Sequence, residues 1–115
     1  MHALIIEDYA LVAIGLQDEL QRLGFASCDI ASSKDEALGM AKARCPDVIL
    51  ADYRLVDGTG VEVVRAICAD RPIPTIYVAG LVDEVLAEEP LATVLEKPVS
   101  SRRLIRAVQE VPATA

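Results

Sequence analysis

The sequence has little of the chemistry that zinc sites need. Its 115 residues include one histidine, His2, and three cysteines, Cys28, Cys45 and Cys68, none of which form a C-x-x-C pair. Zinc sites use clustered histidines and thiolates, so we expect none here. We interpret the cysteines as small apolar packing residues in a reducing compartment. We expect His2 to lie at the frayed start of a strand and to have no role.

Clustered positive charge is also scarce. The formal net charge is −7, and the first basic cluster is Arg102, Arg103 and Arg106, near the end of the chain. Nucleic-acid binding depends on clustered lysine and arginine, so we do not expect nucleic acid as a direct ligand. The helical spacing of the three arginines favours a solvated helix face.

Long hydrophobic runs and a basic leader are absent. The first apolar run ends at Glu7, which argues against a signal peptide, and no stretch approaches the length of a membrane span. We therefore expect a cytoplasmic protein without membrane contact. The length fits one domain, residues 1–115, and we find no repeat, linker or low-complexity segment.

Short aliphatic runs alternate with amphipathic segments along the chain. The runs predict five buried strands, at Ala3–Ile6, Ala26–Ile30, Val48–Ala51, Thr75–Val78 and Thr93–Leu95. The segments predict helices at Tyr9–Leu23, from Ser33 to before Pro46, from Gly60 to before Pro72, at Asp83–Glu89 and at Ser100–Val111. Strands apolar on both faces indicate a parallel sheet covered on both sides. Right-handed crossovers then give an α/β doubly wound fold.

Local signals mark the ends of three of these helices. We expect Gly24 to be the residue that follows the end of the first helix. At the start of the second helix, Ser33 and Glu36 have the pattern of a capping box. In the first helix, Leu11, Ile14, Gly15, Leu20 and Leu23 follow helical spacing. The stretch 57–60, Asp-Gly-Thr-Gly, is typical of a turn leading into the third helix.

Acidic residues follow two of the predicted strands. Glu7 and Asp8 follow the first strand, Asp52 follows the third, and Lys97 with Pro98 follows the fifth. Ligand sites in doubly wound folds lie beyond the carboxyl ends of the strands, so these side chains should converge. Three neighbouring carboxylates repel one another unless a cation binds, and oxygen ligands alone favour a hard ion, best Mg²⁺.

These residues resemble the receiver domain of bacterial response regulators. The resemblance rests on the acid pair, on Asp52 within a D-x-x-L-x-D-G-x-G run, and on the Lys97-Pro98 pair, and it covers Ala3 to about Val111. It implies a flavodoxin-like sheet with strand order 2-1-3-4-5. It also implies a phosphorelay module that takes a phosphoryl group from a histidine kinase or a histidine phosphotransfer protein.

The resemblance also implies a role for each site residue. Asp52 is the phosphoacceptor, and Lys97 pairs with the phosphoryl oxygens. Asp8, Glu7, Asp52 and the backbone carbonyl of Arg54 would hold Mg²⁺. No enzymatic turnover of other substrates is implied. The chain would act as a stand-alone monomer or weak dimer and signal to a downstream protein.

Two switch positions depart from the family pattern. A threonine or serine is expected after the fourth strand, where the chain has Ala79, and an aromatic residue is expected three residues before Lys97, where it has Val94. The segment between Ala79 and Lys97 is also short, which predicts a stunted fourth helix. We therefore expect phosphorylation without the usual coupling between hydroxyl and aromatic residue.

Three other functions remain open at this point. A pseudo-receiver would keep the fold as an interaction module whose output does not depend on phosphorylation, and Ala79 and Val94 favour it. A phosphatase with an aspartate nucleophile is disfavoured because D-x-D is missing after the first strand. A flavin-binding protein is disfavoured because acids in that place repel phosphate.

Overall fold

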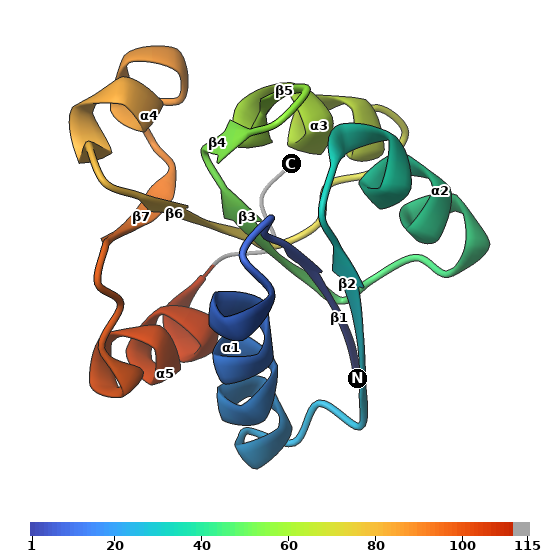
Figure 1. The fold of residues 1–115 in the computed structure, drawn as a ribbon, viewed down its shortest axis with the longest axis vertical. Coiled ribbons are helices and arrows are strands. Elements are labelled where there is room, and N and C mark those ends of the chain that lie inside the picture. The colour runs from blue at the N-terminus through green and yellow to red at the C-terminus, as the bar shows by residue number, and fades with distance from the viewer. Residues whose placement is uncertain (112–115) are drawn as a thin grey trace.

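Parallel strands form the central sheet, as the aliphatic runs predict. The computed structural model describes residues 1–111, and within them the sheet has five strands in the order β2-β1-β3-β6-β7 (Figure 1). They are β1 (His2–Ile6), β2 (Ser27–Ala31), β3 (Val48–Asp52), β6 (Thr75–Ala79) and β7 (Thr93–Glu96). All neighbouring pairs run parallel. The expected order 2-1-3-4-5 is therefore confirmed.

Helices cover both faces of this sheet. They are α1 (Ala10–Arg22), α2 (Lys34–Ala43), α3 (Gly60–Ile67), α4 (Val82–Glu88) and α5 (Ser101–Glu110). Helices α1 and α5 lie on one face, and α2, α3 and α4 lie on the other (Figure 1). Strands β1 and β3 are buried along their whole length, which explains their unbroken apolar sequences. No helix in residues 1–111 has the length and apolar content to cross a membrane.

Helix α1 presents to the core a face that matches the predicted one only near its end, at Leu20 and the partly buried Leu23. Its buried residues are Ala13, Leu16 and Leu20, whereas Leu11 is 86% exposed and Ile14 is 48% exposed. The helix has apolar residues on most of its circumference, so two stripes fit the helical period and the pattern alone does not choose between them. The predicted end is confirmed: Gly24 follows the last turn with a positive φ of 99°.

The helix start at Ser33 is only half of the capping box we predicted. Ser33 Oγ accepts a hydrogen bond from the backbone N–H of Glu36, at 3.2 Å. The Glu36 carboxylate, however, accepts from the backbone N–H and hydroxyl of Ser32 instead of returning to Ser33. A complete capping box occurs at the start of α3, between Thr59 and Glu62. We did not predict this second box from the sequence.

The turn before α3 contains a small hairpin that the sequence did not predict. Its two strands, β4 (Arg54–Leu55) and β5 (Gly58–Thr59), run antiparallel and pair residue by residue. The next residue, Gly60, passes so close to β3 that a Cβ atom there would lie 2.2 Å from the backbone carbonyl oxygen of Asp52. A glycine is therefore required at position 60, and its close approach fixes the loop that leaves Asp52.

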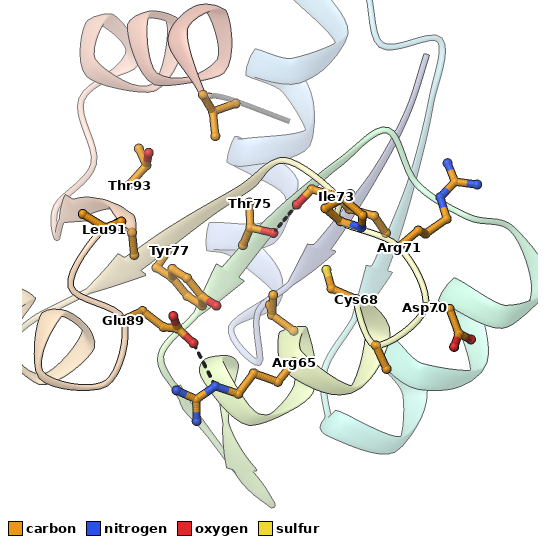
Figure 2. A pocket seen from close by; sticks show the side chains of 15 residues that line it. Arg65, Cys68, Asp70, Arg71, Ile73, Thr75, Tyr77, Glu89, Leu91 and Thr93 are labelled. Atoms are coloured by element: carbon orange, nitrogen blue, oxygen red, sulfur yellow. Dashed lines mark hydrogen bonds and ion pairs between the residues drawn. The ribbon is translucent and has the colours of Figure 1, made fainter. Parts of the chain in front are cut away.

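Helix α4 is short, as the sequence predicts, and it leaves part of the sheet uncovered. It has seven residues, of which only Val85 is buried. Beside it lies a cavity of about 520 Å³ between α3, β6 and the segment before β7. Figure 2 shows Cys68, Thr75 and Tyr77 lining this cavity, with an ion pair between Arg65 and Glu89 at its edge.

Two predictions about His2 and the cysteines are wrong. His2 is 4% exposed, and its ring nitrogens lie 2.8 Å from Ser27 Oγ and 3.0 Å from Asp29 Oδ2. Its backbone N–H also donates to the Asp47 carboxylate, at 2.7 Å. This strand start is therefore anchored by a polar network. Cys45 is exposed and does not serve as a packing residue.

Candidate functional site

Acidic side chains converge at the carboxyl ends of β1 and β3. Glu7 and Asp8 directly follow β1, and Asp52 is the last residue of β3. Each of the three offers a carboxylate oxygen, and these oxygens all lie within 4.8 Å of one another. The central pairing of β1 with β3 brings the two strand ends together. The convergence expected from the sequence is thus present.

Lys97 reaches this cluster from the end of β7. Its Nζ atom lies 3.0 Å from Asp52 Oδ1 and 3.7 Å from Glu7 Oε1. Its backbone N–H donates to the carbonyl oxygen of Ala79, which ties the loop after β7 to the end of β6. One ammonium therefore faces three carboxylates, and the site keeps a negative charge.

Burial dominates the electrostatics of Glu7. The residue is 2% exposed, and burial raises the pKa of its carboxyl to about 8, with the neighbouring Asp52 carboxylate acting in the same direction. Burial acts to lower the pKa of Lys97. The hydrogen bond and charge of Asp52 outweigh it, so the pKa of Lys97 lies above its ordinary value.

The donor set fits a hard divalent cation. Both carboxylate oxygens of Glu7 are buried, and neither has a hydrogen-bond partner among the described residues. Ionising a carboxyl that is buried without hydrogen-bond donors is costly, and Lys97 Nζ, 3.7 Å from Oε1, offsets only part of that cost. A cation bound to these oxygens would offset more of it. The cluster offers oxygen ligands only, which suits Mg²⁺ better than a transition metal.

A cavity of about 330 Å³ lies above Asp52, and its wall lacks a side-chain hydroxyl at the end of β6. Ala79 and Gly80 line it there, so the position expected to carry a hydroxyl has none. Val94 lies on β7 opposite Tyr77 of β6, half-buried against the core on the α3 side of the sheet. The two atypical switch positions thus lie on β6, which pairs with β3, and on β7, which pairs with β6.

Arg54, the first residue of β4, also lines the cavity above Asp52. Its side chain donates to Glu84 on α4, at 2.7 Å, and the preceding Tyr53 hydroxyl donates to Glu88, at 2.6 Å. From the sequence we predicted a role only for the backbone carbonyl of Arg54. The side-chain contacts join residues 30 and 35 positions apart and no motif marks them, so they could not be predicted from the sequence.

Comparison with known proteins identifies the family. The response regulator receiver domain family matches residues 3–109, and the chain belongs to it. It is therefore a receiver domain of two-component signalling systems. The chain is 32% identical over 88 residues to the phyllosphere-induced regulator PhyR of Methylorubrum extorquens, which covers 75% of this chain and 33% of that protein.

Solved structures agree with this assignment. A CheY-like receiver domain from Methylobacillus flagellatus has a TM-score of 0.85 at 28% identity, over 97% of this chain and 98% of that one. The response regulator PhyR from Brucella abortus has a TM-score of 0.85 at 29% identity, over 96% of this chain and 46% of that one. The predicted flavodoxin-like fold is confirmed.

The curated relatives are longer than this chain. A protein-glutamate methylesterase/protein-glutamine glutaminase of Archaeoglobus fulgidus is 30% identical over 84 residues, which are 73% of this chain and 24% of that protein. The chain thus spans a quarter to a third of the length of the two curated relatives described here. The part of this chain that can match the methylesterase belongs to the receiver family, because the family match covers residues 3–109. That family is a signalling family and is generally not enzymatic.

Proposed function

We propose that this chain is a phosphoacceptor receiver domain, residues 1–115, that accepts a phosphoryl group on Asp52. The observation that carries the proposal is the cluster of Glu7, Asp8 and Asp52 with Lys97 Nζ 3.0 Å from Asp52. Three acids at the ends of the neighbouring strands β1 and β3, with one ammonium from the end of β7, suit phosphoryl transfer to a carboxylate. They position the nucleophile and neutralise the charge of the transferred group.

Each residue of the cluster has a distinct part in the proposed transfer. An Asp52 oxygen attacks phosphorus, a new O–P bond forms, and the bond from phosphorus to the donor's histidine nitrogen breaks. Lys97 would bind the phosphoryl oxygens, while Glu7, Asp8, Asp52 and the Arg54 carbonyl would hold Mg²⁺. When bound, Mg²⁺ supplies positive charge against the phosphoryl oxygens. No other substrate is turned over.

Exposed apolar residues around the site support a protein donor. Tyr9 and Leu81 line the cavity above Asp52 and are 70% and 61% exposed, and Leu11 and Val56 are exposed nearby on α1 and in the hairpin. Apolar groups left exposed around an acidic centre suit a helical partner, such as a histidine kinase or a histidine phosphotransfer protein. We place this exchange in the cytoplasm, with the chain as a monomer or weak dimer.

Output is proposed to be protein–protein contact. Nucleic acid is disfavoured by the net charge of −7, and the basic cluster of α5 is a solvated face, since Arg102, Arg103 and Arg106 are all exposed. Ala79 and Val94 favour one alternative, a pseudo-receiver whose partner binds without phosphorylation.

Intact mass spectrometry after reaction with acetyl phosphate and Mg²⁺ tests the proposal. We expect wild type to gain one phosphoryl group and Asp52→Asn to gain none. An unmodified wild-type chain would overturn the phosphoacceptor function.

An NMR titration with Mg²⁺ separates the alternative. A receiver with a working acid site should show saturable shifts at residues 7, 8 and 52, which are lost in Asp8→Asn. A pseudo-receiver with an inactive site should show no saturable response.

A further inference from the structure

We propose that Arg54 is a phosphoryl-binding residue whose guanidinium exchanges between Glu84 on α4 and the phosphorylated Asp52. This exchange would carry the state of the acid site to α4. The inference rests on the proposed phosphorylation of Asp52 and adds a residue and a route of regulation to it. It uses the side chain of Arg54, which is separate from the backbone carbonyl proposed as a metal ligand.

The first argument is the shortage of donors around Asp52. Ala79 has no hydroxyl to offer a phosphoryl oxygen. Among the described residues that line the cavity above Asp52, only Lys97 and Arg54 carry positive charge. Lys97 already faces both Asp52 and Glu7. Besides Lys97, a phosphoryl group on Asp52 therefore has Arg54 as the cationic side chain that lines its cavity.

The second argument is that the present partner of Arg54 is easily replaced. The ion pair with Glu84 has a short distance of 2.7 Å, but the arginine side chain is 73% exposed and the glutamate side chain 32% exposed. Exposed ion pairs contribute little to stability. A phosphoryl group offers three acceptor oxygens and more charge than a carboxylate, and a guanidinium binds it with two parallel hydrogen bonds.

The third argument is that α4 depends on polar contacts. Val85 is its only buried residue, and three of its attachments are made by acidic side chains at its two ends. Glu84 pairs with Arg54, Glu88 accepts from the Tyr53 hydroxyl, and Glu89 pairs with Arg65. Two of these three partners directly follow Asp52 in sequence. Losing the Arg54 contact would release the first turn of a weakly packed helix.

This route would replace the coupling that the switch positions lack. Ala79 offers no hydroxyl to draw toward a phosphoryl group, and Val94 has no aromatic ring to rearrange. The hairpin formed by β4 and β5 instead carries Arg54 directly from the phosphoacceptor strand to α4. Because one guanidinium serves two acceptors, phosphoryl binding and the α4 contact are thermodynamically linked, and each weakens the other.

The linkage predicts opposite effects for the two partners of the ion pair. The probe is beryllium fluoride with Mg²⁺, a phosphoryl mimic, and binding is measured by NMR titration. We expect Arg54→Gln to weaken binding by about tenfold, because a charge-assisted contact is lost. We expect Glu84→Gln to strengthen it severalfold, because the competing acceptor is gone.

A matched control separates this role from simple support of α4. Arg65→Gln breaks the similar pair with Glu89, whose residues do not line the cavity above Asp52. It should alter binding of beryllium fluoride less than twofold. If Arg54→Gln and Glu84→Gln change binding in the same direction, or leave it unchanged, the exchange is overturned.

Hydrogen exchange of α4 gives a second readout. In wild type, beryllium fluoride with Mg²⁺ should speed amide exchange in residues 82–88, and in Arg54→Gln exchange should be fast in both states. Unchanged α4 exchange in wild type saturated with the mimic would overturn the coupling while leaving phosphorylation intact. If wild type neither binds the mimic nor accepts a phosphoryl group, the proposed function itself fails.

Discussion

Replacing Glu7 with glutamine should stabilise the metal-free protein at alkaline pH and have little such effect at acid pH. The carboxyl is 2% exposed, and its oxygens have no hydrogen-bond partner among the described residues. Burial raises its pKa from an ordinary value of 4.5 to about 8. Between these two values the folded state holds a proton that the unfolded state has lost, so stability falls as pH rises.

The size of the effect follows from the shift in the pKa of Glu7. Each pKa unit corresponds to 1.36 kcal/mol, so a rise from 4.5 to about 8 costs the folded state up to about 5 kcal/mol once the pH exceeds both values. A buried glutamine amide without partners costs about 1–3 kcal/mol, but that cost does not vary with pH. The difference in unfolding free energy between variant and wild type should therefore change by several kcal/mol in favour of Glu7→Gln.

Urea unfolding in the presence of EDTA from pH 5 to pH 9 measures this difference. The wild type should lose stability across that range, and Glu7→Gln should lose much less. Glu110→Gln replaces a carboxylate whose side chain is 67% exposed and serves as the control, with a profile parallel to wild type. Added Mg²⁺ should restore wild type at pH 8 because it stabilises the ionised form. Parallel profiles for wild type and Glu7→Gln would refute the reasoning.

Four further variants test other parts of the structure. Gly60→Ala should destabilise by about 3 kcal/mol or more in urea unfolding, because its Cβ would lie 2.2 Å from the Asp52 carbonyl oxygen. Gly39→Ala should instead stabilise the protein by about 0.5–1 kcal/mol, because position 39 lies inside α2 and nothing lies within 4 Å of an added Cβ atom. A loss of stability in this variant would contradict the open space around Gly39. His2→Ala should cost about 2 kcal/mol in the same assay, whereas a neutral result would show that its polar network contributes nothing. Ala79→Ser should tighten binding of beryllium fluoride by about tenfold in an NMR titration, because it adds a hydroxyl donor to the cavity. Unchanged affinity would show that the absence of a hydroxyl at position 79 does not weaken phosphoryl binding.

The sheet and the acid cluster could be predicted because both depend on short, local patterns. A strand buried on both faces needs an unbroken apolar run, and residues 3–6 and 48–51 meet this need. The carboxyl ends of parallel strands meet at one edge. The positions of Glu7, Asp8, Asp52 and Lys97 therefore followed from their places after the strands.

The remaining features depend on contacts that sequence spacing does not encode. Helix α1 is apolar around much of its circumference, so its buried side was set by packing against the sheet and not by periodicity. The Arg54 and Glu84 side chains meet because Arg54 lies in a hairpin of two short strands, β4 and β5, that the sequence did not predict. His2 gained its partners from strand register, which pairs it with Ser27.

The most direct test of the central claim is the site and metal dependence of phosphorylation. Wild type would be treated with acetyl phosphate, once with Mg²⁺ and once with EDTA, and the modified residue mapped by peptide mass spectrometry. We expect one phosphoryl group on Asp52 with Mg²⁺ and almost none with EDTA. A phosphoryl group on another residue, or equal modification with EDTA, would contradict it.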